Sequence, residues 1–101
     1  MLGTELINGM FPRSNAYSPE WVKASASGGA NAMRLCEWLC SVLDLKPGMR
    51  VLDLGCGRAA SSIFHAREFG VPVWATDLWF DPYENMLRIR EAGLASSVYP
   101  M

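Results

Sequence analysis

Two glycines and two aspartates, placed around short apolar runs, are the residues of this sequence best suited to hold a ligand. Gly55 and Gly57 flank Cys56 directly after an apolar run, and without a Cβ they let backbone N–H groups approach a ligand closely. Asp53 precedes Gly55, and Asp77 follows Gly57 by twenty residues, a spacing at which a carboxylate can accept both hydroxyls of a ribose. Because a helix that starts after the glycines offers its positive end there, the pattern predicts a site for an anionic or carboxylate-bearing ligand.

Apolar periodicity, glycine stops and capping residues predict the elements that hold these residues. In chain order we expect a helix over 31–45, a strand over 51–54, a helix over 58–69, a strand over 71–76, a helix over 81–93 and the start of a strand over 97–101. Strands that alternate with helices imply right-handed crossovers and a parallel sheet. The expected fold class is α/β, a Rossmann-like doubly wound parallel sheet whose first strand is covered on both faces. The sheet would be incomplete, because such sheets have about five to seven strands.

The first part of the chain differs in composition, since it is rich in Gly, Ser, Asn and Pro before periodic apolar sequence begins. We expect residues 1–29 to form an N-terminal arm and residues 30–101 to form the N-terminal half of a larger domain. Within the arm, residues 19–23 predict a short helix capped by Ser18, with proline at its first position. Residues 27–29 predict a flexible joint.

The composition of the chain limits which kinds of partner and which cell compartment we expect. Nine Lys and Arg against ten Asp and Glu leave a formal charge of −1 over 101 residues, so the sequence does not predict a nucleic-acid binder. The apolar runs are shorter than the roughly 18 residues that a membrane span needs, and the N-terminus lacks the charge pattern of a secretory signal. Three cysteines, an odd number, favour a reducing compartment, so we expect a cytoplasmic protein.

Other side chains with possible chemistry are better explained by packing. Cys36 and Cys40 are four residues apart and could act as metal ligands, but no further ligands follow at a suitable spacing. We therefore expect core packing for both thiols and no metal. Cys56 fits a space-filling residue better than a nucleophile. His65, the single histidine, is expected at a packed or partly exposed helix position rather than as a catalytic base.

Two motifs indicate a family. Residues 45–57 read LKPGMRVLDLGCG and resemble the first motif of class I S-adenosylmethionine-dependent methyltransferases, with its usual lead-in. Residues 74–78 read WATDL and are similar to the family's second-strand motif. The resemblance covers about residues 31–101. It implies that residues 30–101 are the N-terminal half of a methyltransferase domain and that the cofactor is S-adenosylmethionine.

The resemblance also implies a role for each site residue. The turn from Gly55 through Cys56 to Gly57 would wrap the methionine part of the cofactor. Asp53 would support this loop and the cofactor's amino group, and Asp77 would hold the ribose.

Three further contacts are implied at the margins of this site. Leu78 and Trp79, directly after the second-strand motif, would lie beside the adenine. Residues 12–17 look like the lid segments of small-molecule methyltransferases that fold over the cofactor. Tyr17 is therefore the arm residue that we expect to contact cofactor or substrate.

The family implies methyl transfer by the complete domain to a small-molecule or lipid-like acceptor. The later strands, in which substrate recognition usually resides, are absent from the sequence, so we expect the chain alone to be an incomplete enzyme. An unpaired edge of the third strand would favour self-association.

Two other interpretations stay open. The chain could be an NAD(P)-dependent oxidoreductase, because Gly55, Gly57 and Ala60 also fit the dinucleotide fingerprint and Asp77 is at the ribose distance. Asp53 favours the methyltransferase, because dinucleotide sites commonly have an apolar residue at this position. The chain could also be a truncated remnant without catalytic activity.

Overall fold

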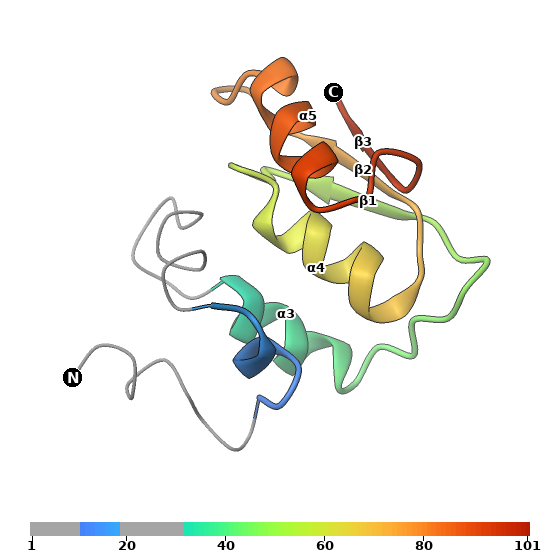
Figure 1. The fold of residues 1–101 in the computed structure, drawn as a ribbon. Coiled ribbons are helices and arrows are strands. Elements are labelled where there is room, and N and C mark those ends of the chain that lie inside the picture. Colours follow the sequence, from blue (N-terminus) through green and yellow to red (C-terminus); the bar gives the residue numbers. More distant parts are fainter. Residues whose placement is uncertain (1–10, 19–31) are drawn as a thin grey trace.

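The structure, a computed structural model, describes residues 11–18 and 32–101 (Figure 1). In chain order its elements are η1 (Ser14–Ala16), α3 (Ala32–Cys40), β1 (Val51–Leu54), α4 (Ala60–Phe69), β2 (Val73–Thr76), α5 (Pro82–Glu91) and β3 (Val98–Pro100). The short helix expected over 19–23 and the joint expected over 27–29 lie outside the described residues. The sequence did not predict η1, which is a single turn of 3-10 helix.

The three strands form a parallel sheet in the order β1-β2-β3, with α4 and α5 as crossovers. Val73 lies opposite Val51 on one side and opposite Val98 on the other. Because the strands are parallel, the carboxyl ends of β1 and β2 meet at one edge of the sheet. The expected α/β class with a parallel sheet is confirmed.

One face of the sheet is covered by the crossover helices, and the other is not. Ile63 of α4 and Ile89 of α5 share a core cluster with Val73 of β2. On the opposite face, Leu52 is 60% exposed and Leu54 is 74% exposed. Both crossovers run in the same direction along the sheet and have the same hand, so they place both helices on one side. The expectation that β1 is covered on both faces is therefore wrong for the described chain.

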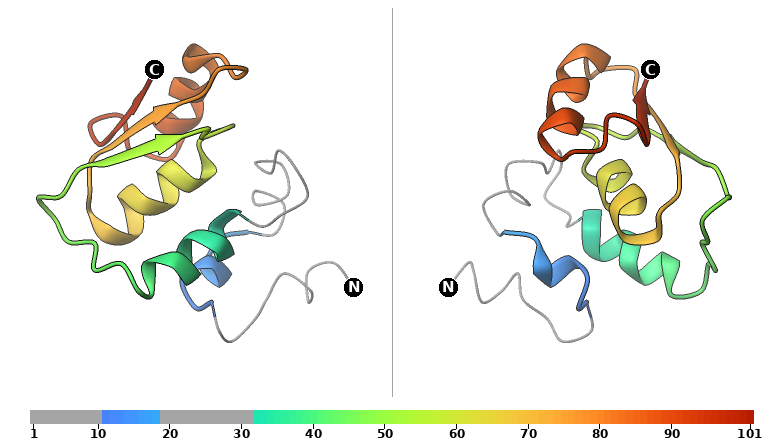
Figure 2. Two further views of the ribbon diagram at one scale, coloured as in Figure 1. Left: turned by 180° about the vertical axis from the view of Figure 1, so that it is seen from behind. Right: turned by 45° about the vertical axis from the view of Figure 1, so that its right-hand side comes forward.

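A second helical layer lies beyond the first. Figure 1 and Figure 2 show α4 between the sheet and α3. The contact between the two helices buries Met33 and Cys36 of α3 against Ala60 and Phe64 of α4. The expected core position of Cys36 is confirmed, and burial raises the pKa of its thiol to about 12. The core position expected for Cys40 is wrong, because this residue at the end of the helix is only half-buried. α3 therefore packs mainly on α4.

α3 ends at Cys40 rather than near residue 45, and the backbone hydrogen bonds after it are mixed. The N–H of Leu43 still donates to the carbonyl of Leu39, four residues earlier. The Ser41 hydroxyl donates to the carbonyl of Trp38 at 2.5 Å. The N–H of Val42 then donates to Leu39, one residue nearer than the partner of an α-helix. Residues 41–43 therefore form turns instead of a continued α-helix.

Two further elements begin two residues later than expected. α4 begins at Ala60 because Ala59 has a φ of 66°, in the left-handed region outside the helix. β2 begins at Val73, after Pro72, which has no N–H to donate to a ladder. α5 begins close to the expected residue 81, and Asp81 caps it, since Oδ1 of Asp81 accepts the N–H of Tyr83 at 2.9 Å.

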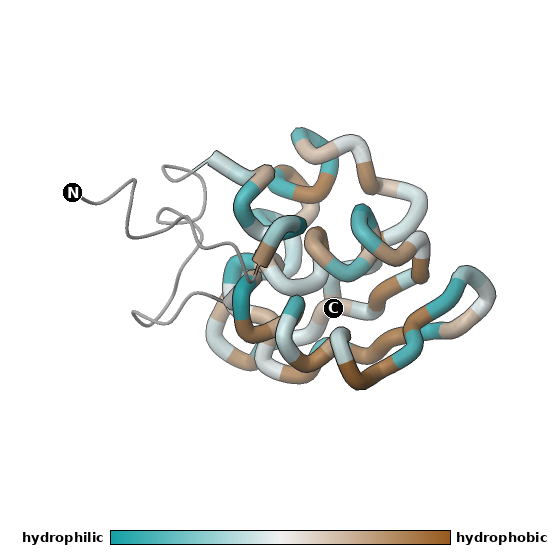
Figure 3. The backbone as a smooth tube through the Cα atoms, turned by 90° about the horizontal axis from the view of Figure 1, so that it is seen from below, coloured by the Kyte–Doolittle hydropathy of each residue, from teal (hydrophilic) through white to brown (hydrophobic). Residues whose placement is uncertain are grey.

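Hydrophobic and hydrophilic residues alternate along the backbone (Figure 3). α4 and α5 have 10 residues each, about half of what a membrane span needs. In the part of the chain that the structure describes, no helix is long and apolar enough to cross a membrane.

Candidate functional site

The turn after β1 depends on residues in the left-handed region of φ. Gly55 has a φ of 74° and Gly57 a φ of 59°. A Cβ on Gly55 would meet no atom within 4 Å, so backbone conformation rather than space requires glycine there. The N–H groups of Gly55 and Cys56 both donate to the carbonyl of Thr76, at 2.8 and 3.0 Å. These bonds tie the turn to the end of β2.

Asp77 follows β2 directly, and its carboxylate accepts hydrogen bonds from three backbone N–H groups. Oδ2 accepts from Gly57 at 2.9 Å, whereas Oδ1 accepts from Trp79 at 2.8 Å and from Phe80 at 3.3 Å. The N–H groups of Trp79 and Gly57 hold the pKa of the Asp77 carboxyl below its usual range, so this group is ionised at neutral pH. The spacing of twenty residues thus brings Gly57 and Asp77 into direct contact.

These bonds correct one sequence-based idea about the glycine turn. The N–H groups of Gly55, Cys56 and Gly57 all donate to residues 76 and 77. They are therefore engaged by β2 and its end instead of facing an anionic ligand. The turn presents a fixed, closely approachable backbone surface at Gly55, which is exposed.

The Asp77 carboxylate retains room for a ligand. A carboxylate offers about four lone-pair positions, and three backbone N–H groups occupy three of them here. The bond from the N–H of Phe80 is the longest of the three, and the side chain of Asp77 is partly exposed. Two hydroxyls of a ribose could be accepted, one at the open position of Oδ2 and one in exchange for the Phe80 bond.

Asp53 is anchored to the first turn of α4. Its Oδ2 accepts from the hydroxyl of Ser61 at 2.6 Å and from the hydroxyl of Ser62 at 2.7 Å, and Ser62 is fully buried. Among the described residues, Oδ1 has no hydrogen-bond partner. Asp53 therefore fixes the start of α4 relative to β1 and keeps one oxygen for a ligand. Sequence reasoning missed these serines, although a pair of hydroxyls in the first turn of a helix was a visible signal.

Cys56 lies inside the turn with 7% of its surface exposed. Burial, with the charges of Asp53 and Asp77, raises the pKa of its thiol to about 11. A thiol with such a pKa is protonated at neutral pH and is a poor nucleophile. The expected space-filling role of Cys56 is confirmed.

Leu78 and Trp79 form an apolar surface next to the Asp77 carboxylate. Each is 86% exposed, and the N–H of Trp79 is one of the groups that bond to Asp77. Behind them, the guanidinium of Arg58 lies over the ring of Phe80 at 5.4 Å from its centroid. A flat aromatic group held beside the Asp77 carboxylate would therefore meet exposed apolar side chains.

Tyr17 contacts α4 from residues 11–18, the described part of the expected arm, which is called the arm below. Its hydroxyl donates to Oε2 of Glu68 at 3.1 Å, and its ring centroid is 5.8 Å from that of Phe64. Burial and the neighbouring Glu68 carboxylate raise the pKa of the Tyr17 hydroxyl to about 12. The hydroxyl of Tyr17 is thus bonded to Glu68 of α4 and is not part of the hydrogen bond between Gly57 and Asp77.

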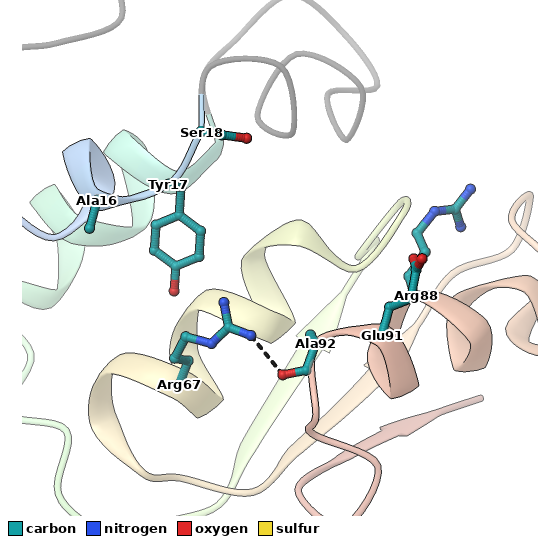
Figure 4. A pocket seen from close by; sticks show the side chains of 7 residues that line it. All are labelled: Ala16, Tyr17, Ser18, Arg67, Arg88, Glu91 and Ala92. Atoms are coloured by element: carbon teal, nitrogen blue, oxygen red, sulfur yellow. Dashed lines mark hydrogen bonds between the residues drawn. The ribbon is translucent and has the colours of Figure 1, made fainter.

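A cavity of about 400 Å³ lies between the arm and the two crossover helices. It is lined by Ala16, Tyr17, Ser18, Arg67, Arg88, Glu91 and Ala92 (Figure 4). Figure 4 shows the ring of Tyr17 directed toward Arg67, whose guanidinium donates to the carbonyl of Ala92 at 2.7 Å. The arm thus forms one wall of this cavity.

Glu37 of α3 holds the arm in place, a role that sequence reasoning missed. Its Oε2 accepts the N–H of Arg13, and its Oε1 accepts both the N–H and the hydroxyl of Ser14, each at 2.9 Å. Arg13 also reaches α4, where its guanidinium lies 3.1 Å from Oε1 of Glu68. The contact spans more than twenty residues, so no local pattern signals it.

His65 is a packed helix residue, as expected. Its ring makes an edge contact with Phe64, with centroids 6.2 Å apart. Burial lowers its pKa below the usual value of 6.5, so the imidazole is neutral at pH 7. Among the described residues, its Nδ1 has no hydrogen-bond partner.

Known proteins similar to the chain include enzymes. No protein-family model matches the chain. Cyclopropane-fatty-acyl-phospholipid synthase of Escherichia coli (strain K12) is 37% identical over 73 residues, which are 71% of this chain and 19% of that protein. Phosphoethanolamine N-methyltransferase 3 of Arabidopsis thaliana is 49% identical over 37 residues, 37% of this chain and 8% of that protein.

A solved structure shows the same fold. It is a SAM-dependent methyltransferase from Geobacter sulfurreducens in complex with S-adenosyl-L-homocysteine, with a TM-score of 0.61 and 30% identity. The match covers 79% of this chain and 33% of that one. The chain thus spans about a fifth of the curated synthase and a third of this solved structure.

Proposed function

We propose that this chain, which belongs to the class I S-adenosylmethionine-dependent methyltransferases, binds S-adenosylmethionine at the carboxyl ends of β1 and β2. The observation that carries this proposal is the 2.9 Å hydrogen bond from the N–H of Gly57 to Oδ2 of Asp77. It joins the two motifs into one site, at the edge of the sheet where α/β proteins bind ligands.

The chemistry of the site fits this cofactor. Asp77 is ionised and has room for ribose hydroxyls, and Leu78 and Trp79 offer apolar surface for the adenine. Oδ1 of Asp53, which accepts no hydrogen bond from the described residues, would be an acceptor for the cofactor's ammonium group. The exposed backbone at Gly55 allows the methionine part to approach the turn.

The bound cofactor would supply a sulfonium methyl group: an acceptor would attack the methyl carbon in line, and the bond from this carbon to sulfur would break, with S-adenosylhomocysteine as the leaving group. For such a reaction the protein mainly provides proximity and orientation. Asp53, in β1, and Asp77, directly after β2, would orient the cofactor. The arm, which Glu37 holds against α3, brings Tyr17 to the margin of the cavity in Figure 4, where it would contact a ligand.

For the whole protein we propose methyl transfer to a small-molecule or lipid-like acceptor. The names of two relatives support this class, because one is a cyclopropane-fatty-acyl-phospholipid synthase and the other a phosphoethanolamine N-methyltransferase. Residues 1–29 would form the arm of that protein and residues 30–101 the first half of its cofactor domain. The three cysteines are free thiols, which supports a cytoplasmic location.

We also propose that the chain self-associates through its sheet. Within the described residues, β1 and β3 each pair on one side only, which leaves two open edges. Leu52 and Leu54 add exposed apolar surface on the uncovered face. Open edges and uncovered apolar faces both favour contact with other chains.

Calorimetric titration with S-adenosylhomocysteine tests the proposed cofactor, with NAD as the control ligand. Circular dichroism first establishes that the chain is folded. Micromolar binding of S-adenosylhomocysteine alone supports the proposal, whereas binding of NAD alone would identify an oxidoreductase-type site. A folded chain that binds neither would contradict the cofactor proposal and leave a non-catalytic remnant.

A further inference from the structure

Asn85 is a polar residue on the buried side of α5. Its exposed fraction is 2%, and one turn later Ile89 is fully buried on the same side of the helix. An amide in such a position has lost its water, which is unfavourable unless its polar atoms are bonded within the protein. Asn85 should therefore have hydrogen-bond partners for its amide at this buried position.

The Asn85 amide bonds to the glycine turn. Its Nδ2 donates to the carbonyl of Gly57 at 2.8 Å and lies 3.8 Å from Sγ of Cys56. Its Oδ1 accepts from Nη1 of Arg88 at 2.8 Å. Because a guanidinium can only donate, the atom facing Arg88 must be the amide oxygen, and the nitrogen is thereby directed at Gly57.

Gly57 is consequently held on both sides. Its N–H donates to Asp77, and its carbonyl accepts from Asn85. These bonds fix the two peptide groups that flank a residue with a left-handed φ of 59°. Glycine has more backbone freedom than other residues, so a turn built on it needs such bonds to keep one conformation.

We propose that Asn85 is a positioning residue of the cofactor site, which keeps Gly57 and, through it, Asp77 in the arrangement that the ligand needs. This role rests on the proposed function of the site. A turn that is ordered before the ligand arrives loses less entropy on binding, so the effect of Asn85 is on affinity. Arg88 supports it by fixing the orientation of the amide.

The test compares two substitutions on the same helix. Asn85→Leu keeps a side chain of similar size and removes the donor to Gly57. Ile89→Val is the matched control, because it loosens the core under α5 without a bond to the turn. Affinity for S-adenosylhomocysteine is measured by calorimetry at a temperature at which all variants are folded, and exchange of the Gly57 amide is measured without ligand.

We expect Asn85→Leu to weaken binding about tenfold and to speed exchange at Gly57, because one buried hydrogen bond is lost. Ile89→Val should lower the melting temperature and leave affinity and exchange at Gly57 unchanged. Unchanged affinity in Asn85→Leu, or equal losses in both variants, would overturn the role of Asn85. If the unsubstituted chain does not bind, the proposed function fails, and faster exchange at Gly57 would then show a purely structural contact.

Discussion

Replacement of Glu37 by alanine is expected to release the arm from the helices. The Glu37 carboxylate accepts three hydrogen bonds from Arg13 and Ser14. These donors stand at the start of η1, where no side chain of the N-cap residue itself bonds to the turn. Glu37 therefore does for this turn what a capping residue does for a helix.

The magnitude follows from the exposure of the partners. The bond to the exposed Arg13 contributes about 0.5 kcal/mol, and each bond to the buried Ser14 contributes about 1 kcal/mol. Together they stabilise the docked arm by about 2.5 kcal/mol. The equilibrium constant for local opening of the arm should therefore rise by between about tenfold and about a hundredfold.

Amide hydrogen exchange measures this opening. The N–H groups of Ala16 and Tyr17 bond to carbonyls within the arm, so their exchange should accelerate by the same factor in Glu37→Ala. The N–H of Ile63, in α4, should be unaffected. Glu37→Gln keeps one acceptor oxygen and should give an intermediate effect. Unchanged exchange at Ala16 and Tyr17 in Glu37→Ala would refute the idea that Glu37 holds the arm.

Three other substitutions or conditions give separate expectations. Asp77→Ala should weaken binding of S-adenosylhomocysteine by between about tenfold and about a hundredfold in calorimetry, because the ribose hydroxyls lose their acceptor; unchanged affinity in a folded variant would place the ribose elsewhere. Burial raises the pKa of Cys36 to about 12 and that of Cys56 to about 11, from the ordinary value of 9.0, so the unfolded chain releases these protons first. The free energy of unfolding in urea should therefore decrease as pH rises from about 9 toward about 11, and a constant value would contradict the burial of both thiols. Leu54→Lys places a charge on the uncovered sheet face and should lower the average mass in light scattering; an unchanged mass would mean that this face is not the contact.

Short sequence patterns predicted where the ends of the elements lie better than they predicted the long-range contacts around them. The cap of α5 follows from Asp81 and Pro82 alone, because capping depends on neighbouring residues. The contact between Gly57 and Asp77 follows from the parallel sheet, which brings the ends of β1 and β2 together. Each of these inferences needed only a short pattern and one topological rule.

Features that depend on distant contacts could not be predicted. Ala59 adopts a left-handed φ that alanine seldom has, and nothing in its neighbourhood signals this conformation. The bonds of Glu37 to the arm and of Asn85 to Gly57 join residues more than twenty positions apart. Whether a face of β1 is covered depends on the side of the sheet on which the helices pack. The apolar side chains of β1 do not indicate that side.

Mapping S-adenosylhomocysteine on the folded chain by amide chemical shifts tests the central claim most directly. The account predicts that added ligand shifts the amides of Gly55 and Gly57 in the turn and of Leu78 and Trp79 after β2. Shifts confined to the cavity residues Arg67 and Arg88, or no shifts at saturating ligand, would contradict a cofactor site at the ends of β1 and β2.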